Sequence, residues 1–242
     1  MKKNIILFAL MINYILVVEA QVSNGLQTPY IGQHSPSFKA QATTGNINFP
    51  DDFFTKWKIL FSHPADFTPV CTSEIMALAE KQENFKKLNT ALIVISTDGL
   101  NSHIEWVKSI ESISIVGKEN VKINFPLVSD VSTEISKKYN LLRKDTTLRK
   151  DMRAVIFIDP DNKIRAILNY PDNIGRNIDE IERILIALQI ADNNEVLTPA
   201  NWKPGKDVLI PSPKTMEESD KLKAKNKSGY YNLTWYMWFR KL

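Results

Sequence analysis

Short apolar runs of strand length alternate with stretches of helical periodicity along the middle of the chain. The strand-like runs are residues 58–62, 91–96 and 125–130, and helices are expected over residues 102–113 and 131–139. This alternation predicts an α/β fold in which helices cover a sheet. Sequence order alone leaves several topologies open.

A helix is expected between the first two of these strands, and its start carries the clearest local signal. Thr68 is a favourable N-cap and Pro69 suits the first helical position. The apolar residues that then fall on one helical face are Ile75, Leu78, Phe85 and Leu88. We therefore expect a strand, a helix and a parallel strand in succession, as in a βαβ unit.

The following part of the sequence predicts a hairpin and another helix. Residues 153–158 and 164–168 flank the segment 159–163, whose Pro, Asp and Asn residues favour a turn. Asn177 is then expected to cap a helix over residues 178–191. Antiparallel pairing after a parallel unit makes the predicted sheet mixed.

The N-terminus has the pattern of a secretory signal peptide. Lys2 and Lys3 precede an apolar run over residues 5–18, and the small residue Ala20 precedes a polar segment. The run is shorter than the about 20 residues that a membrane span needs, so a retained anchor is the weaker interpretation. We expect cleavage after Ala20 and export to a periplasm or a secretory pathway, with no stable membrane insertion.

Composition narrows the classes of partner. The chain has 242 residues and a formal charge of +4, without a basic stripe interleaved with aromatic residues, so nucleic-acid binding is not expected. Domains are predicted at residues 21–191 and 192–242. The strongly aromatic segment 230–239 should pack on the body of the protein or on a partner subunit.

Cys71 is the only cysteine in the sequence and lies in the first turn of the expected helix. Unpaired backbone N–H groups at that position favour an anion, and therefore the reactive thiolate. The hydroxyl of Thr68, three residues earlier, is a candidate to orient a substrate. Position alone leaves open that Cys71 is simply a small buried apolar residue.

The segment 61–74 resembles the active-site segment of peroxiredoxins. Pro64, Thr68 and Cys71 occupy the three motif positions, and the residues around them are most similar to the one-cysteine, peroxiredoxin-6-like subgroup. Residues 152–160 match a second family segment, in which the corresponding arginine is Arg153. The resemblance implies a thioredoxin-like three-layer sandwich with a mixed central sheet and a small C-terminal arm.

The resemblance also implies the residues of the site. It assigns Cys71 as the peroxidatic cysteine, with Thr68 and Arg153 aligning the peroxide and Pro64 shielding the pocket. Supporting roles are expected, with purely structural alternatives left open, for His63, Glu74 and Arg176. The structural alternative for Arg176 is an ion pair with Asp179 or Glu180 at the start of a helix.

The implied activity is thiol-dependent reduction of hydrogen peroxide and organic hydroperoxides. Cys71 would become a sulfenic acid and be recycled by an external thiol, either a small thiol or a thioredoxin-like protein, without a cofactor. A metal site is not expected, because Cys71 lacks tight ligand spacing to His34, His63 or His103. The family's C-terminal arm predicts a homodimer. The alternative is a non-catalytic binding or chaperone protein on the same fold.

Overall fold

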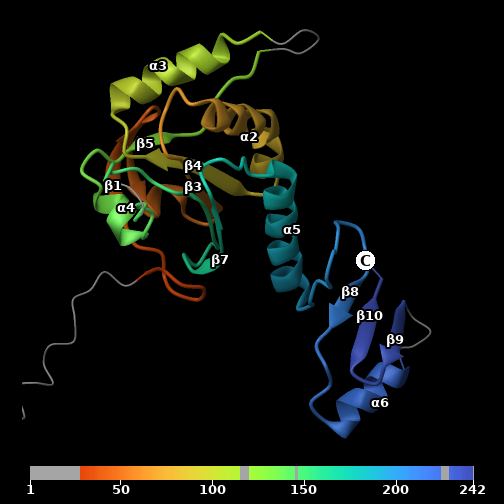
Figure 1. The fold of residues 1–242 in the computed structure, drawn as a ribbon. Helices are drawn as coiled ribbons and strands as arrows, with labels where there is room; N and C mark the ends of the chain where they lie inside the picture. The colour runs from red at the N-terminus through yellow and green to blue at the C-terminus, as the bar shows by residue number, and fades with distance from the viewer. Residues whose placement is uncertain (1–27, 115–119, 145–146, 225–228, 242) are drawn as a thin grey trace, which may run out of the picture.

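A seven-stranded mixed sheet forms the centre of the protein in the computed structural model, which describes residues 28–114, 120–144, 147–224 and 229–241 (Figure 1). The strand order is β2-β1-β5-β4-β3-β6-β7. The strands are β1 (Phe38–Ala42), β2 (Gly45–Phe49), β3 (Trp57–Ser62), β4 (Thr90–Ser96), β5 (Leu127–Ser129), β6 (Arg153–Ile158) and β7 (Ile164–Tyr170). The expected βαβ unit and hairpin are both present, since β3 pairs with β4 in parallel and β6 pairs with β7 in antiparallel register.

Helices cover both faces of this sheet. They are α2 (Pro69–Lys87), α3 (Leu100–Glu111), α4 (Glu134–Lys138) and α5 (Ile178–Asn194), with a short 3-10 helix η1 (Asp51–Phe53). One hydrophobic cluster joins α2, α3 and α5 to one face, and a second joins α4 to the other, with side chains of β1 and β2 contributing to it. The predicted three-layer α/β sandwich of the thioredoxin type is therefore confirmed.

Side-chain alternation along β3 explains why both faces are apolar. Ile59 and Phe61 belong to the cluster under α2 and α5, whereas Leu60 between them belongs to the cluster under α4. All three side chains are almost fully buried, as expected for a central strand with neighbours on both sides. The loop that leaves the end of β3 and enters α2 therefore starts from a buried strand with neighbours on both sides.

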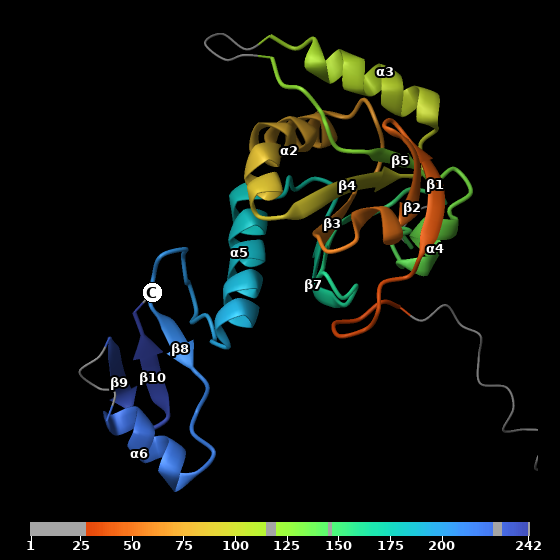
Figure 2. The ribbon, with the colours of Figure 1, turned by 180° about the vertical axis from the view of Figure 1, so that it is seen from behind.

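The C-terminal residues form a small separate sheet beyond the end of α5 (Figures 1 and 2). It contains β8 (Val208–Ile210), β9 (Tyr230–Thr234) and β10 (Met237–Arg240), with α6 (Met216–Ala224) beside it. Trp202 and Val208 pack against Ile186 and Ala187 of α5. The expected C-terminal arm is present, and the predicted domain boundary after residue 191 falls within the last turn of α5.

The aromatic segment 230–239 forms both long strands of this arm. Trp238 is buried, and the rings of Tyr231 and Phe239 stack at 5.0 Å between centroids. Trp235 and Tyr236, at the turn between β9 and β10, remain exposed. The segment therefore packs within the arm itself, and packing of Trp235 and Tyr236 on a partner subunit stays a prediction.

Element boundaries differ from the expected ones at a few places. Helix α3 begins at Leu100 with Gly99 as its N-cap, so Ser102 lies inside the helix instead of starting it. Helix α4 begins only at Glu134, because Thr133 adopts a left-handed conformation at its N-cap. The predicted signal peptide lies outside the described residues. None of the helices within the described ranges is long and apolar enough to cross a membrane.

Candidate active site

Cys71 is the third residue of α2 and its side chain is fully buried. Thr68 is the N-cap in an extended conformation and Pro69 is the first helical residue, as the sequence predicts. The thiol forms no disulfide. Its position beside the unpaired N–H groups of the first turn favours an anionic sulfur.

Thr68 holds the predicted position but uses its hydroxyl differently from a usual helix cap. Its Oγ1 donates to the carbonyl oxygen of Ala65 at 3.0 Å and makes no hydrogen bond to the backbone of α2. The carbonyl oxygen of Thr68 instead accepts from the N–H of Thr72 at 2.9 Å. Because the hydroxyl hydrogen is directed at Ala65, the lone pairs of Oγ1 remain available to a ligand.

Arg153 is brought to the sulfur by β6, although it lies 82 positions after Cys71 in the chain. Its Nη1 donates to Sγ of Cys71 at 3.2 Å and to Oε2 of Glu74 at 2.8 Å. Its Nε donates to the carbonyl oxygen of Asp172 at 2.9 Å. Three contacts therefore hold the guanidinium, and Glu74, for which only a supporting role is expected from the sequence, is one of the partners.

Arg176 belongs to the same network and not to either alternative partner. Its backbone N–H and its Nε donate to Oε1 of Glu74 at 2.8 and 2.9 Å, and its Nη2 donates to Oε2 at 2.8 Å. Nη1 donates to the carbonyl oxygens of Ser62 and Ala154. Glu180, a partner considered from the sequence, instead pairs with Arg183.

The charges of these groups balance only when Cys71 is ionised. Arg153 and Arg176 contribute two positive charges, and Glu74 contributes one negative charge in the same buried region. Burial lowers the pKa of Arg176, while Glu74 and Cys71 oppose that shift, and a guanidinium starts so high that it remains charged. The three groups alone carry a formal charge of +1, which an anion at Cys71 would balance.

His63 and Pro64 lie in the loop between β3 and α2, and both are buried. Nε2 of His63 is 2.9 Å from Oδ1 of Asp66, while Nδ1 has no hydrogen-bond partner. The ring of His63 packs 5.0 Å from that of Trp106. The polar partner of His63 is therefore Asp66, and the packing of the ring supports the loop that carries Thr68.

Sequence reasoning did not predict that Asp66 and His103 meet next to this loop. Nδ1 of His103 is 2.8 Å from Oδ2 of Asp66. Possible ligand atoms of His63, Asp66 and His103 lie within 4.8 Å of one another, which is spacing that a metal ion can use. These atoms are already hydrogen-bonded to one another. The available sequence signal was Asp66 inside the motif and a histidine on the apolar face of α3.

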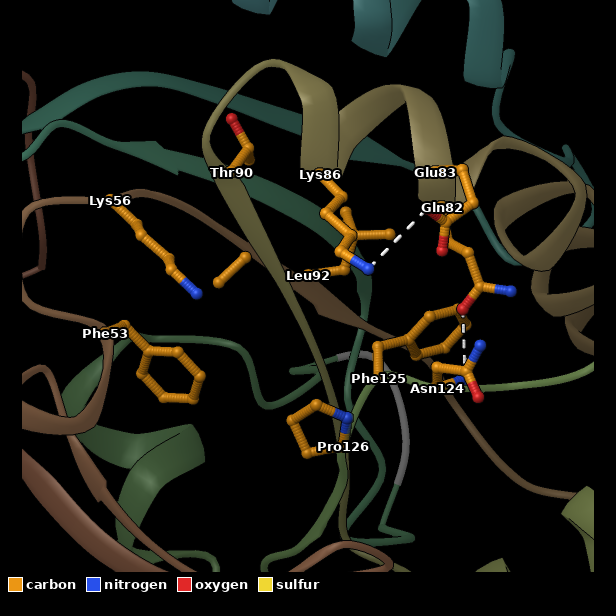
Figure 3. A pocket seen from close by; sticks show the side chains of 11 residues that line it. Phe53, Lys56, Gln82, Glu83, Lys86, Thr90, Leu92, Asn124, Phe125 and Pro126 are labelled. Carbon is orange, nitrogen blue, oxygen red and sulfur yellow. Dashed lines mark hydrogen bonds and ion pairs between the residues drawn. The ribbon is translucent and has the colours of Figure 1, made fainter.

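A surface hollow of about 330 Å³ lies at the other end of α2 (Figure 3). Gln82, Glu83 and Lys86 line it from α2, Phe53 lines it from η1, and Phe125 lines it from the loop before β5. None of the predicted catalytic residues contributes to it. The candidate chemistry is therefore in the buried site at the start of α2 and not in this open hollow.

Comparison with known protein families gives two matches. Residues 31–167 match the AhpC/TSA family, and residues 187–225 match the C-terminal domain of 1-Cys peroxiredoxin. The first match spans the sheet, α2 and Arg153. The second begins within α5 and continues into the arm.

Similar proteins cover nearly the same length. The chain is 48% identical to a peroxiredoxin of Methanosarcina mazei over 214 residues, 88% of this chain and 98% of that protein. Among solved structures, a yeast mitochondrial 1-Cys peroxiredoxin is 37% identical with a TM-score of 0.75, covering 88% of this chain and 99% of that one. A cysteine-to-serine mutant of peroxiredoxin 6 of Arenicola marina is 29% identical with a TM-score of 0.78, covering 88% and 97%. The chain therefore belongs to the peroxiredoxin family, and with its single cysteine it is a one-cysteine, thiol-dependent peroxidase.

Proposed function

We propose that this peroxiredoxin reduces hydrogen peroxide and organic hydroperoxides by direct attack of the Cys71 thiolate on a peroxide oxygen. The observation that carries the proposal is the 3.2 Å contact between Nη1 of Arg153 and Sγ of Cys71. The same nitrogen is held by Glu74 at 2.8 Å, so the positive charge is fixed beside the sulfur before a substrate arrives.

The reaction balances as a two-electron oxidation of sulfur. An electron pair of the thiolate forms the S–O bond to the terminal peroxide oxygen while the O–O bond breaks. The leaving oxygen takes the electron pair of that bond and a proton from solvent, which gives water or an alcohol. Cys71 becomes a sulfenic acid. Arg153 is assigned to stabilise the negative charge that develops on the leaving oxygen.

Thr68 and Pro64 are assigned to the substrate side of this reaction. Because the Thr68 hydroxyl donates to Ala65, its Oγ1 can accept a hydrogen bond from the peroxide O–H. Pro64 is buried in the same loop and carries no N–H that would bind competing water. Together they would orient a peroxide toward the sulfur.

The test is peroxide reduction by Cys71→Ser and Arg153→Met. Cys71→Ser should lose nearly all peroxide consumption, and Arg153→Met should slow sulfenic acid formation by about 100-fold, the usual effect of removing one charge-stabilising donor. Arg149→Met is the control, because Arg149 is an exposed arginine of the loop before β6. Full activity in Cys71→Ser would refute the assignment. A protein that only binds partners would consume no peroxide, and its partner binding would not change in either variant.

We further propose that the chain is exported. The support is the sequence of residues 1–20, with two lysines, an apolar run and a small residue at the expected cleavage site. Intact mass spectrometry of the protein from its native source should give the mass of a chain that begins at Gln21. A chain that retains residues 1–20 would contradict export by cleavage.

A homodimer is the last part of the proposal. Beyond Ile164, whose backbone bonds to Gly32 and Gln33, the outer edge of β7 pairs with no strand in the described chain. Leu233, Trp235 and Tyr236 expose apolar surface on the arm. Both surfaces suit burial against a second copy. Sedimentation of the full-length protein should give a dimer, weakened in a Trp235→Ser, Tyr236→Ser double variant. A monomer at micromolar concentration would refute this.

A further inference from the structure

Asp66 is the meeting point of two buried histidines. Its Oδ1 is 2.9 Å from Nε2 of His63, and its Oδ2 is 2.8 Å from Nδ1 of His103. The side chains of both histidines are fully enclosed, and that of Asp66 is only 2% exposed. No part of the peroxidase mechanism described above uses Asp66 or His103.

The hydrogen-bond partners of His103 determine where its protons are. Its Nε2 is 3.2 Å from the carbonyl oxygen of Val128, which can only accept, so Nε2 carries a proton. Its Nδ1 faces both carboxylate oxygens of Asp66, at 2.8 and 3.1 Å. If Asp66 is ionised, Nδ1 carries a proton as well and the ring is a cation.

The surroundings of Asp66 favour the ionised carboxylate. Burial alone would raise the pKa of Asp66, but hydrogen bonds from His103 and His63 outweigh burial and hold that pKa well below its usual range. For His63 burial is the larger effect, so its pKa is lowered and its ring is neutral, with the proton on Nε2. A further charged group near His63 is Asp98, which follows the end of β4.

The backbone around Asp66 is tied to the same region. Its N–H donates to Oδ2 of Asp98 at 2.9 Å, and Oδ2 of Asp98 also accepts from the hydroxyl of Ser96. The next residue, Phe67, has a φ of 55°, a conformation that a bulky side chain adopts only where tertiary contacts hold it. The carbonyl of Ala65, in the same peptide unit as the Asp66 N–H, accepts the Thr68 hydroxyl.

We propose that Asp66 and His103 form a buried carboxylate–imidazolium pair that fixes the loop between β3 and α2 and thereby orients the hydroxyl of Thr68 for peroxide binding. Both are positioning residues. The pair connects α3 to the peptide unit whose carbonyl directs the Thr68 hydroxyl hydrogen away from the substrate. The inference rests on the role proposed for Thr68, but the protonation of His103 can be tested without it.

The first experiment measures the protonation of His103 directly. The chain contains three histidines, so ¹⁵N spectra of histidine-labelled protein at pH 7 are simple to assign with the His34→Gln variant. His103 should show two protonated ring nitrogens and His63 should show one. A single proton on His103 would overturn the pair. So would a stoichiometric divalent ion in the purified protein whose removal by a chelator shifts the His103 signals.

The second experiment tests whether the pair acts through Thr68. Asp66→Asn should remove one proton from His103 and slow sulfenic acid formation with hydrogen peroxide by about 10-fold or more, while alkylation of Cys71 by iodoacetamide changes less than about 2-fold because Arg153 is untouched. Asp161→Asn, an exposed aspartate, is the control. His103→Gln, which keeps one donor, should retain more peroxidase rate than His103→Ala.

A double-mutant cycle separates the outcomes. If Asp66 works by orienting Thr68, Asp66→Asn should cause no further loss of rate in a Thr68→Val background. Additive losses would overturn the positioning role. Full activity of Thr68→Val alone would refute the role proposed for Thr68. The protonation of His103 would still be decided by the ¹⁵N spectra. If Asp66→Asn does not fold, the spectra of the unmodified protein still decide the pair.

Discussion

Glu74 is the residue that keeps two buried arginines together beside the thiol. Its two carboxylate oxygens accept four hydrogen bonds, one from Arg153 and three from Arg176. Without this carboxylate, two guanidinium groups would face each other in a region that excludes water. Glu74 therefore joins the buried ion pairs to the Arg153 nitrogen that contacts Cys71.

We predict that Glu74→Gln destabilises the protein by about 3–5 kcal/mol, the usual cost of leaving a buried ion pair with one partner. Peroxide reduction should also fall, since Arg153 loses its anchor. Urea unfolding and stopped-flow kinetics measure the two effects. Glu83→Gln on the same helix is the control, because its pair with Lys86 is exposed and such pairs contribute about 0–1 kcal/mol. Equal losses in the two variants would contradict this account.

Asp151 is a buried carboxyl group without a compensating partner. It is fully buried just before β6, and neither of its oxygens has a hydrogen bond. The nearby hydroxyl of Ser136 has one proton and donates it to Asp130 at 2.7 Å. Burial raises the pKa of Asp151 to about 7, Ser136 opposes the shift, and the charges of Asp130 and Asp98 increase it.

The raised pKa of Asp151 predicts a stability that falls as pH rises. An unfolded aspartate ionises near pH 4. Below about pH 4 the folded and unfolded states both keep the proton, so ionisation of Asp151 does not change the free energy of unfolding. Between about pH 4 and pH 7 only the unfolded state releases it, which lowers the free energy of unfolding by about 4 kcal/mol in total. The free energy of unfolding of Asp151→Asn, relative to that of the natural chain, should therefore rise between about pH 4 and pH 7 and stay constant above that range. Urea unfolding at several pH values measures the gap, and a gap independent of pH would contradict the prediction.

At the scale of the elements, α2 and α5 both begin at the N-cap residues expected from the sequence. Only one of the two N-cap side chains forms a hydrogen bond to the backbone of its helix. The side chain of Asn177 accepts from the N–H of Glu180 at 3.1 Å, whereas the hydroxyl of Thr68 donates to Ala65. Helix α2 thus begins without a side-chain cap, because the Thr68 hydroxyl is directed at Ala65 instead.

Asn177→Ala should lower the free energy of unfolding by about 1 kcal/mol, because one N–H at the start of α5 loses its acceptor. The expected consequence for chemistry is small, since Asn177 contacts none of Cys71, Arg153 or Glu74. Thermal unfolding and peroxide assays measure both. Asn193→Ala, at the exposed end of the same helix, is the control and should lose no stability. A collapse of activity in Asn177→Ala would show that α5 positions Arg176 more directly than the contacts indicate.

Local patterns explain which elements and site residues could be predicted. The strands β3 to β7, including the β6–β7 hairpin, and the motif residues Thr68 and Cys71 each depend on a few neighbouring positions. The start of α3 at Gly99 could not be found, because glycine gives no capping signal from a side chain. The contact of Asp66 with His103 joins residues 37 positions apart and depends on how α3 packs against the sheet. No local periodicity contains that information.

At the scale of the whole molecule, one thiol in 242 residues decides how the catalytic cycle closes. Once Cys71 is a sulfenic acid, the sequence offers no second cysteine to condense with it. In the proposed dimer the only other thiol is the partner's copy of the same fully buried cysteine. The reducing equivalents must therefore come from an external thiol, which attacks Cys71 and is then displaced by a second thiol.

Turnover should consequently require an added thiol, because the chain has no second cysteine to act as reductant. With peroxide alone, the purified protein is expected to consume one equivalent per chain and stop, and a sulfenic-acid trap should label Cys71 in that product. With a small thiol or a thioredoxin-like protein, consumption should continue, and a mixed disulfide at Cys71 should be seen by mass spectrometry when the thiol is limiting. Cys71→Ser is the control for peroxide decay that does not involve the site. Sustained turnover without thiol would contradict this cycle, because the chain holds no other reductant. A disulfide between two copies of Cys71 as the main product of one equivalent of peroxide would also contradict it, because the thiol of a second chain is buried and not placed to react.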